Sequence, residues 1–164
     1  MVYILAAIDK VTTMKNKLLI TVLLAAFSCA AFAGHHEDPN IDAIKQAINN
    51  YVKDFIARDY PGIASHFQAP MMQRTANGIT VATTSKAVEN DFRNYLENVQ
   101  DGYAYSTIDR VDVTKIESTI YYADIDYTRF NNKDQMLHEG RGIYFFSNAD
   151  GAWRMFYMQD VARE

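Results

Sequence analysis

One histidine has the chemistry of a general base. His66 follows a short apolar segment and comes four residues before Pro70, where the chain is expected to turn. An imidazole changes its charge near neutral pH, so His66 could accept a proton from a substrate if a second group oriented its ring. The sequence names no such group, and a structural or exposed histidine is the alternative. His138, which begins an expected strand next to Glu139, is interpreted as exposed.

Tyrosines are the second set of candidates, because the chain holds 11 of them. A phenol hydroxyl can polarise a carbonyl group, so Tyr127 and Tyr144 could assist a base in a lyase or isomerase reaction that needs no cofactor. Tyr95 and Tyr157, together with Met71, could instead line a ligand pocket. Packing in the core or on a sheet face is the alternative for each of these side chains.

Arg129 could bind the carboxylate of a ligand. It belongs to the more apolar of the two alternating sets in segment 119–130, which we expect to face the helices. A guanidinium is planar and can hold a carboxylate through two hydrogen bonds. The alternative is an arginine at the rim, paired with Glu139 or Asp134 across the hairpin. Arg141, on the next strand, has the same two interpretations.

Asp124 and Asp126 belong to the other alternating set of the same segment. Two carboxylates on one face could form an acid–base pair. A solvent-exposed sheet face is the simpler explanation, and it is the one that we adopt for these two residues.

Residues 14–33 predict where the protein is located. The stretch MKNKLLITVLLAAFSCAAFA has a basic start, an apolar run and small residues before a cleavage point after Ala33. This layout is typical of a secretory signal peptide. We therefore expect translation to begin at Met14, residues 1–13 to precede the true start, and the mature protein to be periplasmic or secreted. A retained membrane anchor is the alternative, although the apolar run is shorter than the roughly 20 residues that a bilayer requires.

Cleavage after Ala33 would also change the chemistry of the chain. It removes Cys29, the single cysteine, and with it any disulfide or thiolate reaction. Residues 34–40 then form a polar tail. The new terminus Gly34-His35-His36 could bind Cu(II) or Ni(II) through His36, although a short polar tail can contain this pattern by chance.

Composition excludes several classes of function. The expected mature chain of 131 residues fits one domain, and its 13 basic and 19 acidic residues give a net charge of −6. A nucleic-acid partner is therefore not expected. The sequence contains no phosphate-binding glycine loop, nucleophile elbow, zinc-spaced cluster or dinucleotide fingerprint. We expect no cofactor and, after processing, no stable membrane anchor.

Helices precede strands in the expected order of elements. Apolar spacing predicts a helix from residue 41, a short helix at 62–67 and a helix that is capped by Thr84 or Ser85 and stopped by Gly102. Asn77-Gly78 predicts a hairpin between segments 71–76 and 79–83. Four alternating segments then predict an antiparallel meander, at 103–115, 119–130, 136–147 and 152–161. This order is typical of an α+β domain.

Four segments carry a resemblance to a known superfamily. They are IDAIKQAINNYVKDFIARDY, IASHFQAPMM, the hairpin at Asn77-Gly78, and YTRFNNKDQMLHEGRGIYFFSNADGAWRMFYMQD. Together they resemble the nuclear transport factor 2-like superfamily, which includes SnoaL-like and ketosteroid isomerase-like proteins. The resemblance covers residues 41–159 and suggests that 41–164 form a SnoaL-like domain of an exported bacterial protein.

The resemblance implies a cystatin-like α+β cone, in which N-terminal helices pack in the concavity of a curved antiparallel sheet and leave a pocket. We expect this domain to bind a small apolar or aromatic molecule. One alternative is a cofactor-independent lyase or isomerase with His66 as base. Another is a homodimerising scaffold that uses Tyr122, Thr128 and Phe130 on the exposed sheet face. The fold hosts enzymes and binding modules alike, so the sequence does not decide whether the protein is catalytic.

Overall fold

The computed structural model describes residues 38–75 and 78–162. The expected signal peptide at 14–33 and His36 lie outside this part of the chain and stay predictions. Among the described residues, no helix is long and apolar enough to cross a membrane. The same residues contain no group of three or more His, Cys, Asp or Glu side chains that could hold a metal ion.

The first described helix is α2 (Pro39–Ala57). It begins after Asp38, whose carboxylate accepts a hydrogen bond from the backbone N–H of Asn40 at 3.0 Å. This N-cap satisfies one of the N–H groups that a helix start leaves without a helical partner. The helix is followed by Arg58, which adopts the left-handed conformation with φ of 55°. The expected tail at 34–40 is therefore shorter, because its last two residues are helical.

One face of α2 is buried. Its buried side chains recur at the three- and four-residue spacing of an amphipathic helix: Ile44, Ile48, Tyr51 and Phe55. They join a hydrophobic core that also contains Tyr121 and Phe146 from the sheet, neither of which has any exposed surface. The helix thus lies against the inner face of the sheet and presents two aromatic rings to it.

Two shorter helices and a hairpin follow α2 along the chain. These elements are α3 (Tyr60–Ser65), β1 (Phe67–Thr75), β2 (Gly78–Ala82) and α4 (Ser85–Glu97). The strand pairing runs up to Thr75 and Gly78, which confirms the hairpin expected around Asn77-Gly78. Thr84 caps α4, as expected, because its hydroxyl accepts a hydrogen bond from the N–H of Ala87 at 3.1 Å.

Four long strands complete the domain. They are β3 (Tyr103–Glu117), β4 (Ile120–Asn131), β5 (Met136–Ser147) and β6 (Arg154–Val161). Each pairs antiparallel with the next, which confirms the expected meander. The alternation in β4 also has the expected sense, since Tyr121, Ala123 and Ile125 are buried on the helix side.

The sheet has six strands in the order β2-β1-β6-β5-β4-β3. The hairpin joins the meander through β1 and β6, and these two strands run parallel. The sheet is therefore mixed, whereas the sequence predicts a purely antiparallel sheet. A hairpin fixes the direction of only the two strands that it connects. Strands β1 and β6 are separated along the chain by α4 and four other strands, so no short turn constrains their relative direction.

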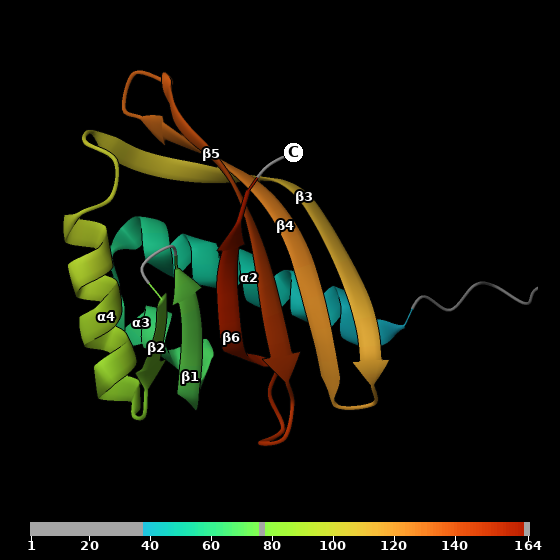
Figure 1. The fold of residues 1–164 in the computed structure, drawn as a ribbon. Coiled ribbons are helices and arrows are strands. Elements are labelled where there is room, and N and C mark those ends of the chain that lie inside the picture. The colour runs from blue at the N-terminus through green and yellow to red at the C-terminus, as the bar shows by residue number, and fades with distance from the viewer. Residues whose placement is uncertain (1–37, 76–77, 163–164) are drawn as a thin grey trace, which may run out of the picture. The chain divides into compact units, whose positions relative to one another are not determined.

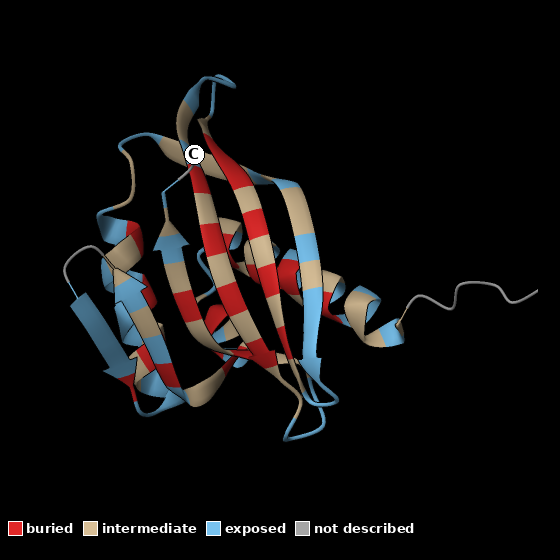
Figure 2. Cartoon of the chain, turned by 45° about the vertical axis from the view of Figure 1, so that its right-hand side comes forward, coloured by how far each residue is buried: buried red, intermediate tan, exposed pale blue. Residues whose placement is uncertain are grey.

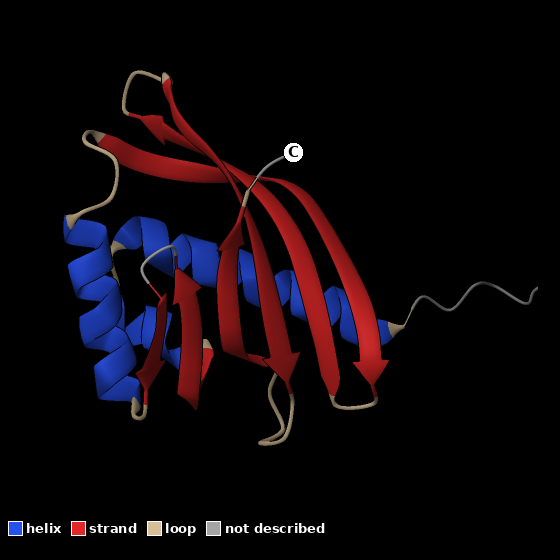
Figure 3. Ribbon diagram, viewed as in Figure 1, coloured by secondary structure: helices blue, strands red, loops and turns tan. Residues whose placement is uncertain are grey.

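The helices lie together on one side of the curved sheet, and α2 runs across the long strands (Figure 1). Figure 3 shows the same separation of a helical layer from a strand layer. Buried and partly exposed residues alternate along the central strands, as expected where one face of a sheet is covered (Figure 2). The expected α+β architecture, with helices in the concavity of the sheet, is confirmed.

Candidate functional site

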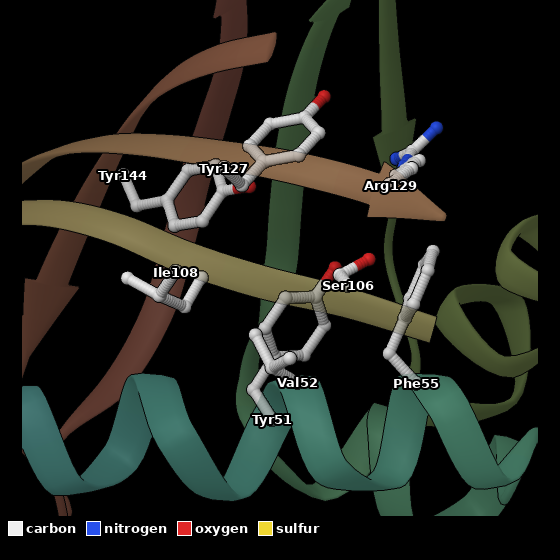
Figure 4. A pocket seen from close by; sticks show the side chains of 8 residues that line it. All are labelled: Tyr51, Val52, Phe55, Ser106, Ile108, Tyr127, Arg129 and Tyr144. Carbon is white, nitrogen blue, oxygen red and sulfur yellow. The ribbon is translucent and has the colours of Figure 1, made fainter. Parts of the chain in front are cut away.

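A small cavity, called here the inner cavity, lies between α2 and the strands that cross it. Its volume is about 30 Å³, which leaves room for only one or two water-sized groups. The lining residues are Tyr51, Val52, Phe55, Ser106, Ile108, Tyr127, Arg129 and Tyr144. Figure 4 shows the side chains of α2 rising toward those from β3 and β4, so helix and sheet both contribute to this cavity.

Arg129, near the end of β4, is the charged residue of this cavity, and only 6% of its surface is exposed. One guanidinium nitrogen, Nη1, donates to the side-chain oxygen of Gln100 at 2.9 Å. The other, Nη2, donates to the hydroxyl of Tyr95 at 2.8 Å. The buried Nε has no hydrogen-bond partner among residues 38–75 and 78–162. Both hydrogen-bond partners are neutral, so they orient the guanidinium without compensating its charge.

Aromatic rings surround this guanidinium. Four ring centroids lie 5.1–5.8 Å from its central carbon, those of Phe55, Tyr95, Tyr103 and Tyr127. Cation–π attraction to the ring faces offsets part of the cost of burying the charge. No carboxylate of the described chain forms an ion pair with Arg129. Arg129 is therefore a buried cation with no carboxylate of the described chain in direct contact.

Three phenol hydroxyls lie near this cation, those of Tyr51, Tyr127 and Tyr144. No described residue forms a hydrogen bond with any of the three hydroxyl groups. Burial raises the pKa of Tyr127 to about 12 and raises the pKa of Tyr51 and of Tyr144 well above the ordinary value. All three phenols therefore stay protonated at neutral pH and can each donate a hydrogen bond.

Two glycines of β5 make space for two of these rings. A Cβ atom at Gly140 would lie 2.7 Å from Cε2 of Tyr127, and closer still to the end of its ring. A Cβ atom at Gly142 would lie 2.7 Å from Cε1 of Tyr144. Such distances are well inside van der Waals contact, so any other residue would displace the rings. The glycine pair thus positions the hydroxyls, in agreement with the close packing that glycines inside a strand suggest.

A larger polar cleft adjoins the inner cavity and has a volume of about 420 Å³. Its lining consists of Tyr95, Gln100, Tyr127, Arg129, His138, Glu139, Gly140, Arg141, Asp160, Val161 and Ala162. Arg129 and Tyr127 line both spaces, so they mark the boundary between them. The volume falls within the range of about 300–1,000 Å³ that is typical of small-molecule sites.

Two titratable residues of the polar cleft were not identified as candidates from the sequence. His138 is half-buried rather than exposed, and desolvation, helped by the charge of Arg129, lowers its pKa. Asp160 keeps an exposed surface, yet desolvation raises the pKa of its carboxyl group while Arg129 acts in the opposite direction. The strand register puts His138 directly opposite Arg129. The hairpin at 131–135 sets this register, so the length of the turn in the sequence could have predicted that His138 lies beside Arg129.

His66 lies outside the lining of both spaces. It caps α3, and its Nε2 atom is 2.7 Å from a carboxylate oxygen of Asp54 on α2. Its ring packs edge-on against the ring of Tyr51, with centroids 6.1 Å apart. Asp54 is therefore an orienting group for the ring of His66, which the sequence alone did not identify. The hydrogen bond between them joins His66 to α2. His66 lines neither the inner cavity nor the polar cleft, and its role as a base stays a prediction.

The other sequence candidates divide into two groups. Tyr95, Tyr127, Tyr144 and Arg129 come together around the two spaces, and the burial of Arg129 excludes the rim alternative. Met71 is buried in the core. Tyr157 packs against Phe145 on the opposite face of the sheet and donates to Gln159 at 2.8 Å. Neither Met71 nor Tyr157 lines the inner cavity or the polar cleft.

The outer face of the sheet carries a different arrangement of charge. Arg110 on β3 contacts three carboxylates, those of Asp112, Asp124 and Asp126, the last two at 3.0 and 2.8 Å. Arg141 on β5 donates two hydrogen bonds to Asp124, at 2.9 and 2.7 Å. The hydrogen bonds from Arg141, and then those from Arg110, lower the pKa of Asp124. These residues form a compensated ion network, so Asp124 and Asp126 do not form an acid–base pair.

Comparisons with known proteins agree on the fold. The sequence model of a family described as NTF2-like protein (DUF6841) matches residues 38–163. A search among curated proteins finds no match.

Solved structures with similar folds come from several bacteria. A protein of unknown function with a cystatin-like fold from Nostoc punctiforme aligns with a TM-score of 0.65 and 12% identity, over 76% of this chain and 91% of that one. Aln2 from Streptomyces aligns with a TM-score of 0.63 and 18% identity over the same shares. An NTF2-like protein of unknown function from Pseudomonas putida aligns with a TM-score of 0.61 and 13% identity, over 73% and 84%. At such identities the likeness establishes the fold alone.

Proposed function

This chain belongs to the NTF2-like protein family DUF6841, and we propose that it binds a small organic anion whose carboxylate lies against Arg129. The ligand places this carboxylate at the boundary between the inner cavity and the polar cleft. The remainder of the ligand occupies the polar cleft, because the inner cavity has room for only one or two water-sized groups.

The uncompensated charge of Arg129 carries this proposal. Burying a cation without an anion is costly, and native proteins normally pair such groups. Only two N–H groups of the guanidinium donate to described residues, which leaves further donors available. A ligand carboxylate would supply the missing negative charge and accept these hydrogen bonds.

The surrounding groups suit the same kind of ligand. The hydroxyl groups of Tyr127 and Tyr144 remain protonated at neutral pH and can donate to the bound oxygen. The rings of Tyr95 and Tyr127 form apolar parts of the cleft wall. A carboxylate with a short aromatic or aliphatic body therefore fits better than the small apolar or aromatic molecule that we expect from the sequence.

Calorimetry with a matched pair of probes tests the proposal. We expect 4-methylbenzoate to bind the wild-type protein and its methyl ester, which has the same ring but no charge, to bind at least about ten times more weakly. Arg129→Met should abolish the difference between the two probes. Arg110→Met, which removes an arginine from the outer face, is the matched control and should preserve it. Equal affinity of the wild-type protein for the acid and the ester would refute the proposal.

A further inference from the structure

A second charge, of opposite sign, faces the same cleft as Arg129. Asp160, on β6, lines the polar cleft. It also lines a narrow neighbouring cavity of about 20 Å³, together with Arg129, Tyr95 and Met158. Arg129 and Asp160 thus both line the polar cleft and this neighbouring cavity.

These two charges do not neutralise each other by direct contact. Among residues 38–75 and 78–162, Asp160 forms no ion pair and its side chain forms no hydrogen bond. The attraction of Arg129 still reaches the carboxyl group, since it acts to lower the pKa of Asp160. The two groups are therefore close enough to interact and too far apart to form a salt bridge. A ligand between them could contact both.

The other titratable groups of the cleft are less suited than Arg129 and Asp160 to contact the two ends of a ligand. His138 has a lowered pKa because of desolvation and the nearby Arg129, so it is neutral at neutral pH. Arg141 already donates two hydrogen bonds to Asp124. Glu139 lines the cleft as well and adds negative charge to its wall. The lining of the cleft thus combines the buried cation of Arg129 with the carboxylate of Asp160.

We propose that the ligand of this cleft is zwitterionic, an amino acid in the broad sense, with its carboxylate on Arg129 and its protonated amine on Asp160. This inference rests on the proposed function and makes it more specific, because it assigns a second polar end to the bound anion. A site with two fixed and opposite charges favours a ligand that carries both complementary charges over a ligand that carries only one.

The test compares amino acids with the same molecules lacking the amine. Three pairs cover short, intermediate and long separations of the two charges: glycine with acetate, 4-aminobutyrate with butyrate, and 4-(aminomethyl)benzoate with 4-methylbenzoate. Binding is measured by calorimetry for the wild-type protein, Asp160→Asn and Arg110→Met. Asp160→Asn keeps the shape of an exposed side chain, so the fold should be preserved, and a thermal unfolding curve verifies this.

We expect at least one amino acid to bind about ten times more tightly than its partner without the amine. Asp160→Asn should remove that gain without weakening the binding of the simple carboxylate, whereas Arg110→Met should change neither value. If simple carboxylates bind as well as every amino acid, the zwitterion inference is wrong and the anion proposal survives. A gain that persists in Asp160→Asn would also refute the inference. If no probe of either kind binds, both proposals fail.

Discussion

Two arginines on neighbouring strands have opposite environments. Arg110, on β3, lies on the outer face of the sheet and contacts three carboxylates. Arg129, on β4, lies on the inner face, is almost fully buried, and contacts only neutral groups. The better solvated arginine therefore has all of the acidic partners, whereas the buried one has none in direct contact within the described chain.

This difference separates structural charge from functional charge. An exposed arginine needs no partner, and surface ion pairs add little to stability. A buried arginine does need one, so the absence of a carboxylate beside Arg129 costs stability unless something else offsets it. Proteins keep costly local arrangements mainly at functional sites. We therefore interpret the unpaired guanidinium as one half of a binding interaction.

The largest expected effect comes from removing Arg129 itself. Arg129→Met should weaken the binding of 4-methylbenzoate by at least about 100-fold, because it deletes a desolvated charge pair of roughly 3 kcal/mol. The free energy of unfolding should stay the same or rise by about 1 kcal/mol, since a buried charge is replaced by an apolar chain. Calorimetry and urea unfolding measure the two quantities. A strongly destabilised variant would show instead that the guanidinium is needed for folding.

The next effect comes from the glycine that makes space for Tyr127. Gly140→Ala should push the ring out of its position, weaken carboxylate binding by about tenfold and lower the free energy of unfolding by about 1–3 kcal/mol. The double variant Gly140→Ala/Tyr127→Leu should recover most of the stability, because the clash involves the end of the aromatic ring. It should not recover the binding. Additive losses of stability in the double variant would contradict this explanation.

A smaller effect is expected on the outer face. Asp124→Asn should lower the free energy of unfolding by about 1 kcal/mol, because Asp124 contacts both Arg110 and Arg141. The pKa of Asp124 is lowered in the folded protein, so its contribution is present at neutral pH and lost as the pH falls through that lowered value. Urea unfolding at several pH values, with and without added salt, measures this. A loss of stability that is the same at every pH would contradict this explanation.

The smallest effect concerns His138. Its pKa is lowered in the folded protein, so the unfolded chain binds a proton more readily, and stability is lost as the pH falls below the unfolded value of about 6.5. His138→Asn should reduce this loss by a few tenths of a kcal/mol. Urea unfolding between pH 5 and pH 8 checks the sign. An unchanged pH dependence would show that Arg129 and the cleft do not influence this histidine.

Much of the fold could be predicted from the sequence, because local chemistry determines it. Alternation in β4 placed Tyr121 and Arg129 on the inner face, and Asn77-Gly78 predicted the hairpin. The parallel pairing of β1 with β6 could not be predicted in this way. This pairing joins two segments that are far apart in the sequence, and no turn or periodic pattern in the sequence predicts which distant strands pair.

The site was predicted in part. Arg129 and Tyr127 were identified because side-chain type and strand face together indicated them, and Tyr144 was identified from its phenol group alone. Asp160 was not identified, since a lone aspartate near the end of a strand has no local pattern, and its place in the cleft comes from the pairing of β6 with β5. The partner of His66 depended in the same way on the packing of α3 against α2. Strand register and helix packing, rather than residue type, decided these cases.

The most direct test of the central claim follows the side-chain N–H signals of the arginines by NMR during a titration. The buried Nε–H of Arg129 is shielded from solvent, so its proton should exchange slowly enough to be observed. We predict that 4-methylbenzoate shifts this signal in a saturable manner and leaves the signal of Arg110 in place. Saturable binding that leaves the Arg129 signal unmoved, or that moves the signal of Arg110 instead, would contradict the account.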